Sequence, residues 1–298
     1  MITEQTQELS EKLRQKILTQ LPSQARLETA VPGLTLSRYD EPTSAIRCFY
    51  QPMIAIVVQG FKHSMIGDYE ASYGARQCII VGVDMPGVFH ITDASPQNPF
   101  LSLSVKLDRQ ILSRLIGEMP SILTEGDAAC TPVAIAETNR DILDAFLRLV
   151  ALLDAPERIP VLAPLILQEI HFYLLSSRQG SCLRLFNTGG TQANRISRAI
   201  SWLREHYAEP FHAEELARQV HMAPSTFNRH FRQVTSLSPL QFQKRLRLYE
   251  AERLMLVEGQ DAGTAALMVG YESGSQFNRE YKRQFGAPPR RDVTKKRS

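Results

Sequence analysis

The sequence predicts an α+β protein of two domains: an antiparallel β domain with flanking helices, and then an all-helical domain. Three observations predict this class. Short apolar runs separated by turn residues fill about residues 34–107, helical periodicity returns after them, and one helical unit occurs twice near the C-terminal end. The chain has 298 residues, which is enough for two domains with separate cores.

The first predicted element is an amphipathic helix over residues 3–21, where apolar side chains recur every four residues at Leu9, Leu13, Ile17 and Leu21. The apolar runs that follow are bounded by glycine and proline, and they occupy residues 53–58, 78–81, 88–91 and 101–105. Short strands at near-regular spacing are typical of an antiparallel sandwich or barrel, and both remain open at this point.

Helical periodicity then predicts helices over residues 108–118, 139–154 and 160–177. The apolar stripe of the second helix is either core or a dimer surface. The third is too short and too polar to span a bilayer, and we expect a core or interface helix. Glycine, serine and asparagine predict a hinge around 179–192. We place the first domain at 1–185, a linker at 186–193 and the second domain at 194–298.

The charge is divided unevenly between the two halves of the chain. Residues 1–191 hold 16 Lys and Arg against 20 Asp and Glu, whereas residues 192–298 hold 18 against 11, a net charge of +7. A basic C-terminal domain suits the binding of a polyanion. The N-terminus lacks the features of a signal peptide. The four cysteines are widely scattered without a C-x-x-C pair, so we expect reduced thiols in a cytoplasmic protein.

The helical unit at residues 225–232 returns at residues 275–282, and each copy has one apolar and one cationic face. In the first copy Phe227 and Phe231 fall on the buried side, and the preceding helix and tight connection predict a helix-turn-helix. Pro224 suits a helix start, and Ser273 with Gln276 can form a capping box. A long helix beginning at Ser238 should set the distance between the units.

The exposed faces carry side chains that can read duplex DNA. They are Ser225, Asn228, Arg229 and Arg232 in the first copy, and Ser275, Asn278, Arg279 and Lys282 in the second. Arginine pairs with guanine and asparagine with adenine in the major groove, whereas Arg232 and Lys282 suit phosphate contacts. Two helices roughly 34 Å apart would match one turn of B-DNA. The simpler alternative is a solvated helix face copied by duplication.

These motifs resemble the DNA-binding domain of AraC/XylS-type transcription regulators, over residues 194–292. The resemblance rests on Ala266-x-x-x-Gly270-Tyr271, Ser275-x-Phe277-x-Arg279 and their partial copy in the first unit. It implies two helix-turn-helix units joined by a long helix, with Gln276 also facing bases. The sequence departs from the family at three places, namely Ala223 in place of a serine cap, Ser236 in place of glycine and Asp292 in place of an aromatic residue.

Residues 31–119 are similar to the N-terminal domain of an AraC-type subfamily, through Gln51-Pro52, Val57-Val-Gln-Gly60 and Asp84-Met-Pro86. The resemblance implies a cupin-like β-barrel that senses a small-molecule effector and forms a homodimer. The expected partners are therefore double-stranded DNA, an unknown effector and a second copy, with RNA polymerase as a further candidate and no membrane. We expect a transcription regulator with no cofactor.

Two other functions are possible for such a chain. A cupin enzyme needs about three convergent metal ligands, but His63 and His90 lack the usual H-x-H pattern, so we expect no metal and no catalytic residue. Each of the two is expected to be a strand histidine that hydrogen-bonds to backbone. A regulator whose barrel only dimerises remains open. Lys62 and Gln59 flank a glycine turn, where turn support is preferred over ligand contact. Cys48 and Cys78 are expected in strands, and the Lys295-Lys296-Arg297 tail as disordered.

Overall fold

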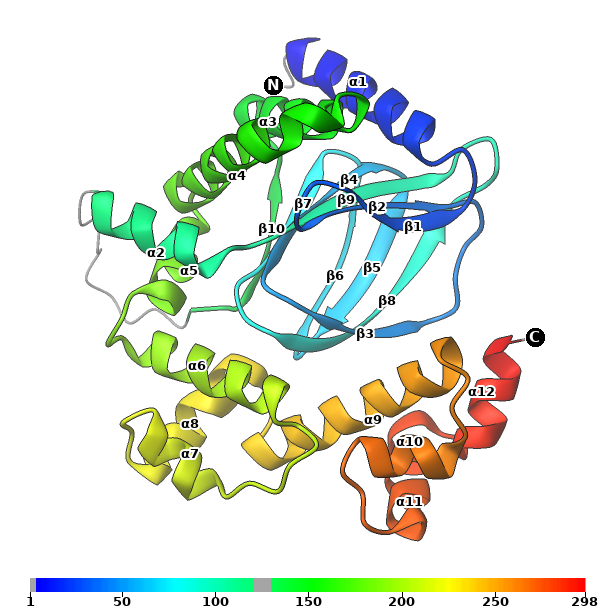
Figure 1. Ribbon diagram of the computed structural model, residues 1–298, viewed down its shortest axis with the longest axis vertical. Helices are drawn as coiled ribbons and strands as arrows, with labels where there is room; N and C mark the ends of the chain where they lie inside the picture. Colours follow the sequence, from blue (N-terminus) through cyan, green and yellow to red (C-terminus); the bar gives the residue numbers. More distant parts are fainter. Residues whose placement is uncertain (1–3, 120–129, 298) are drawn as a thin grey trace.

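The computed structural model describes residues 4–119 and 130–297 (Figure 1). It confirms an α+β chain with a β domain followed by a helical domain. The strands of the β domain are β1 (Ala25–Glu28), β2 (Leu34–Tyr39), β3 (Ile46–Tyr50), β4 (Met53–Gln59), β5 (Phe61–Ile66), β6 (Tyr69–Gly74), β7 (Gln77–Val81), β8 (Met85–Asp93), β9 (Phe100–Lys106) and β10 (Val133–Glu137).

The strands form two antiparallel sheets rather than one closed barrel. Six strands pair in the order β1-β2-β9-β4-β7-β10, and four in the order β3-β8-β5-β6. Alternation along β4 shows why both faces of the larger sheet are apolar: Ile54 and Ile56 join the core under the helices, whereas Val57 belongs to the core shared with the smaller sheet. The edge strands β1 and β10 lie outside the predicted strand region.

Helices cover the outer face of the larger sheet (Figure 1). They are α1 (Glu4–Gln20), α2 (Arg109–Glu118), α3 (Arg140–Ala151) and α4 (Ile159–Ser176), with short 3-10 turns at Leu152–Asp154 and Pro156–Arg158. The α3 stripe of Ile142, Phe146 and Leu149 is fully enclosed, so it is core rather than a dimer surface. By length and composition alone, residues 156–176 would pass as a membrane span, but α4 packs on α2, α3 and α5.

The predicted hinge is shorter than expected. Helix α5 (Gly180–Asn187) occupies most of residues 179–187, and only residues 188–191 separate it from the helical domain. Leu183 and Phe186 account for this helix, because both side chains are buried: Leu183 joins the core under the helices, and Phe186 joins the core that α6 shares with the sheets. The domain boundaries at residues 185 and 193 stay a prediction.

The helical domain contains α6 (Gln192–Glu205), α7 (Ala213–Gln219), α8 (Pro224–Thr235), α9 (Pro239–Val257), α10 (Ala262–Met268), α11 (Gly274–Phe285) and α12 (Pro289–Arg297). The last of these corrects the prediction of a disordered tail. Lys296 forms ion pairs with Glu252 and Asp292, and these contacts hold α12 against α9.

Candidate nucleic-acid interface and sensor interior

The first helix-turn-helix consists of α7 and α8. Phe227 and Phe231 are fully buried against Phe242 of α9, as the spacing predicts. Pro224 occupies the first turn of α8, and Ala223 supplies no side-chain cap. At the other end Ser236 adopts a left-handed conformation with φ of 63°, the conformation that glycine adopts most easily. Two of the three departures from the family pattern, Ala223 and Ser236, therefore fall at the two ends of α8.

The second unit consists of α10 and α11, with Phe277, Tyr281 and Phe285 on the buried side. Gly270 turns the chain between them with φ of 85°, and a Cβ there would lie 2.0 Å from the carbonyl oxygen of Ala208. Only half of the expected capping box is present. Ser273 accepts from the Gln276 backbone N–H, but the Gln276 side chain donates to Glu280 instead.

Helix α9 joins the two units through Arg247. Its guanidinium donates to the carbonyl oxygens of Tyr207, Ala208 and Glu209 before the first unit, and to Gly270 in the second. Lys244 adds an ion pair to Glu280 of α11 at 2.7 Å. These bonds fix both units on one helix, which is about 28 Å long from its 19 residues.

All nine predicted DNA-contacting residues lie outside the buried faces of α8 and α11. Eight are exposed, and Asn228 is half-buried because its amide donates to the Pro224 carbonyl oxygen at 2.9 Å. Asn228, Arg229 and Arg232 surround one surface hollow. A second hollow on α11 is lined by Gln276, Arg279, Glu280 and Arg283. Five of the nine predicted residues therefore line these two hollows, three on α8 and two on α11.

Arg283 is a candidate contact that was not predicted. It is exposed and lies four residues after Arg279. The helical repeat would therefore have predicted that both arginines lie on the same face of α11. His230 and Gln233 of α8 face a separate groove of about 750 Å³, which Arg229 also lines. The polar surface of α8 and α11 therefore includes more residues than the repeated motif indicates.

Lys62 of β5 lies on the inward face of the smaller sheet, together with Ser64 and Ile66. Its Nζ is 3.8 Å from the centroid of the Phe89 ring and 5.6 Å from that of Tyr50. Burial, with a further effect of Arg26, lowers the pKa of Lys62 to about 8. Within the described chain it has no carboxylate partner. Gln59, in contrast, supports the turn as predicted, donating to the Pro99 carbonyl oxygen at 2.7 Å.

The two strand histidines lie on the opposite, outer face. His63 bonds to the side chains of Ser72 and Glu70 rather than to backbone, which corrects that detail of the prediction, and its ring lies 4.8 Å from that of His90. Among residues 4–119 and 130–297, no three His, Cys, Asp or Glu side chains are grouped as metal ligands would be.

A buried ionic cluster joins the β domain to the helical domain. Arg47 of β3 pairs with Glu252 of α9 at 2.8 Å and with Asp292 of α12 at 3.6 Å, and it lies over the Phe285 ring. Tyr281 of α11 donates to the same Asp292 at 2.9 Å. Asp292, which departs from the family pattern, therefore connects a core tyrosine of the second unit to the β domain.

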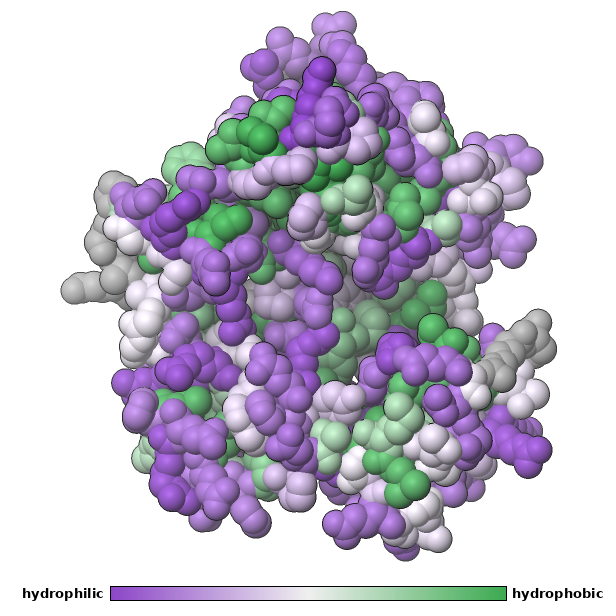
Figure 2. Space-filling view, in the orientation of Figure 1, coloured by the Kyte–Doolittle hydropathy of each residue, from purple (hydrophilic) through white to green (hydrophobic). Residues whose placement is uncertain are grey.

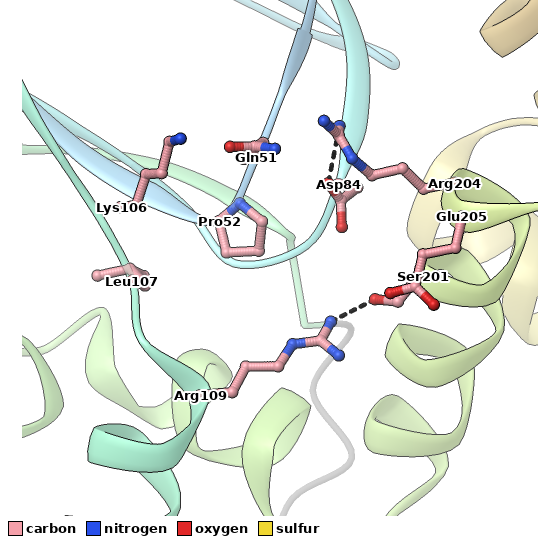
Figure 3. A pocket seen from close by; sticks show the side chains of 9 residues that line it. All are labelled: Gln51, Pro52, Asp84, Lys106, Leu107, Arg109, Ser201, Arg204 and Glu205. Carbon is pink, nitrogen blue, oxygen red and sulfur yellow. Dashed lines mark hydrogen bonds and ion pairs between the residues drawn. The ribbon is translucent and has the colours of Figure 1, made fainter. Parts of the chain in front are cut away.

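A second contact between the domains borders a pocket of about 310 Å³ (Figure 3). Arg204 of α6 pairs with Asp84 at 3.0 Å, and Arg109 of α2 donates to Ser201 of α6. Burial raises the pKa of the Asp84 carboxyl, and the two arginines oppose that shift. The helical domain is thus attached to the β domain by separate polar contacts at α6 and at α9–α12.

The cysteines correct one prediction. Cys130 and Cys182 form a disulfide between the segment before β10 and the first turn of α5, with Cα atoms 5.3 Å apart. Cys48 and Cys78 are free and lie in strands as expected. Burial raises the pKa of both thiols to about 11.

Two helix-turn-helix units on one connecting helix, behind a double-sheet domain, define a class of DNA-binding transcription regulators with a separate N-terminal domain. Comparison with known families agrees with this class. The AraC-type transcriptional regulator N-terminus matches residues 30–182, and a helix-turn-helix domain matches residues 216–294. The chain belongs to the AraC-type transcriptional regulators.

Proteins of similar sequence include transcriptional activators. The virulence regulon transcriptional activator VirF of Yersinia enterocolitica is 24% identical over 75% of each chain. The HTH-type transcriptional activator RhaS of Escherichia fergusonii is 30% identical over 32% of this chain, which spans about a third of that relative. Apo ToxT of Vibrio cholerae has the same fold, with a TM-score of 0.60 and 8% identity over 90% of this chain and 99% of ToxT. A ToxT structure with bound unsaturated fatty acid gives a TM-score of 0.57 at 8% identity, over 90% and 97% of the chains.

Proposed function

We propose that this protein regulates transcription by inserting α8 and α11 into neighbouring major grooves of duplex DNA. The observation that carries the proposal is the pair of exposed cationic faces held on one helix by Arg247. Ser225, Asn228 and Arg229 would read one groove, and Ser275, Gln276, Asn278 and Arg279 the next. Arg232 and Lys282 would contact phosphates.

The test is selection of bound duplexes from a randomised library by the full chain, followed by titration of the selected site. Specific binding is expected to exceed binding to scrambled duplex by about 10³-fold or more. Arg158→Ala is a matched control, because Arg158 is an exposed arginine far along the chain from both recognition helices. Equal affinity for selected and scrambled duplexes would contradict the proposal.

We further propose that the β domain responds to a small carboxylate with an apolar body. Lys62 supports this, because an inward-facing ammonium beside the Phe89 and Tyr50 rings lacks an anion that would offset its desolvation. The fatty acid bound to ToxT provides the chemical class. Binding of the carboxylate would raise the pKa of Lys62 and favour one placement of the domains.

The effector proposal is tested by thermal shift of the full chain against long-chain and aromatic carboxylates, each paired with its methyl ester. Acids are expected to raise the melting temperature and esters to leave it unchanged. Lys62→Met should abolish the response, whereas Lys12→Met, at an exposed lysine of α1, should retain it. Equal shifts with acids and esters would exclude an ionic contact. No shift with any ligand would favour a β domain that serves only in dimerisation.

A homodimer is proposed through α4, which exposes apolar side chains on its outer face. Val161 is 68% exposed and Leu165 61% exposed, and Figure 2 shows apolar surface gathered over the α3–α4 layer. Val161→Glu with Leu165→Glu should convert dimers to monomers in sedimentation, and unchanged sedimentation would place the interface elsewhere. We propose a cytoplasmic regulator without a catalytic role, with RNA polymerase as a further partner.

A further inference from the structure

The Cys130–Cys182 disulfide lies at the junction between the β domain and the DNA-reading helices. Cys130 precedes β10, the edge strand that pairs with β7, and Cys182 lies in the first turn of α5. Helix α5 leads directly into α6, and the Asn194 side chain of α6 donates to the Phe186 carbonyl oxygen at 2.9 Å. The bond therefore connects the larger sheet to α5, which packs on α6, and α6 in turn packs on α8 of the first helix-turn-helix.

The disulfide is accessible from two sides. Both cysteines are half-exposed, and each lines a groove: Cys130 one of about 750 Å³ and Cys182 one of about 240 Å³. The position of Cys182 in the first turn of α5 favours a thiolate, because backbone N–H groups at a helix start stabilise negative charge. Arg178 lines the same groove as Cys182. Cys182 is thus the better leaving group of the pair.

The groove of about 750 Å³ extends from Cys130 to the first recognition helix. Its lining includes Phe186 of α5, Ile196 of α6, and Arg229 and His230 of α8. Cys130 and Arg229, which is proposed to read a base, therefore line one groove. While the disulfide is closed, Cys130 is tied to α5 at one wall of the groove that Arg229 and His230 also line.

We infer that Cys130 and Cys182 form a reversible thiol–disulfide exchange site, which takes a dithiol reductant and controls access of DNA to α8. The inference rests on the proposed DNA-binding function. One thiolate of the reductant attacks the Sγ of Cys130, the Sγ–Sγ bond breaks, and Cys182 leaves as a thiolate that takes up a proton. The second thiolate of the reductant then attacks its own mixed-disulfide sulfur and releases Cys130, which is protonated in turn. Two electrons and two protons pass to the protein, and the reductant becomes a disulfide. Cytoplasmic disulfides are commonly transient and redox-sensing, which agrees with this role.

The chemistry can be tested without DNA. The folded full chain is treated with oxidised glutathione or with dithiothreitol at neutral pH, alkylated with N-ethylmaleimide, and mapped by peptide mass. A Cys130–Cys182 cross-link is expected after oxidation, with both residues alkylated after reduction in the absence of denaturant. Cys48 and Cys78 should label slowly in both forms, because burial raises the pKa of each to about 11. Failure to form the cross-link, or its persistence in dithiothreitol, would overturn the inference.

The consequence for DNA is tested with the duplex selected by the full chain. The reduced protein is expected to bind at least about fivefold more tightly than the oxidised protein, within the usual range of coupling between sites. Cys130→Ser with Cys182→Ser should bind like the reduced protein under both conditions, and Cys78→Ala should retain the response. Reduced and alkylated wild type provides a second open form if the double variant does not fold. Equal affinities of oxidised and reduced protein would refute control of DNA access, whereas the absence of specific binding in both forms would instead refute the proposed function.

Discussion

Replacing Lys62 by methionine should stabilise the ligand-free protein. Burial lowers the pKa of Lys62 from 10.5 to about 8, so keeping this side chain charged at neutral pH costs about 3 kcal/mol. The contact with the Phe89 ring offsets about 1 kcal/mol of it. Lys62→Met keeps an unbranched apolar stem between the same rings, so the free energy of unfolding should rise by about 2 kcal/mol at pH 7.

The pH dependence of this stability difference distinguishes the cost of the buried charge from a change in side-chain packing. Since the folded pKa lies below the unfolded pKa, the unfolded chain binds the extra proton between pH 8 and pH 10.5. The stability of the wild type should therefore rise through this window relative to Lys62→Met, and the advantage of the variant should shrink there. Urea unfolding of both proteins from pH 7 to pH 10.5 measures this difference in the free energy of unfolding. A variant that is less stable than wild type at pH 7, or a difference that does not change with pH, would refute the account of Lys62.

Arg229→Ala and Arg279→Ala should each weaken specific DNA binding by about 1–3 kcal/mol and relax the preference at one base pair; an equal loss on all duplexes would contradict base reading. Binding by the full chain should fall steeply between low and moderate salt, as filter binding would show, because phosphate contacts release counterions. Gly270→Ala should lower the free energy of unfolding by more than about 2 kcal/mol in urea, since its Cβ would meet the Ala208 carbonyl oxygen at 2.0 Å. Tyr281→Phe should cost about 1–3 kcal/mol in the same assay, because the buried Asp292 carboxylate loses a donor.

The parts of the fold that local periodicity determines could be predicted from the sequence. The stripe of Phe227 and Phe231 repeats at Phe277 and Tyr281, so the helices and their exposed faces followed from spacing alone. Helix α1 was predicted for the same reason, and strand β4 from a short apolar run bounded by turn residues. In these segments the residues that form the buried face lie close together in the sequence, so the local pattern identifies that face without knowledge of the tertiary structure.

The remaining features depend on partners that are distant in the sequence. The Cys130–Cys182 bond spans 52 residues, and no spacing rule pairs them. Strand β1 has four residues, of which three are exposed. It is held in the sheet by its backbone pairing with β2 rather than by buried side chains. Helix α12 is stabilised by Lys296 contacts with α9 rather than by an apolar stripe. The inward position of Lys62 could have been read from its alternation with Ser64 and Ile66 on β5.

Arg247 has a consequence for the arrangement of binding sites on a promoter. One guanidinium bonds both units to α9. In the proposed complex the two units therefore stay at a fixed separation, and the two half-sites of one subunit must keep a constant phase on the duplex. Inserting about five base pairs between them would turn the second half-site to the far side of the helix. If α8 and α11 read DNA as proposed, the spacer between the half-sites of one subunit should therefore tolerate little change in length.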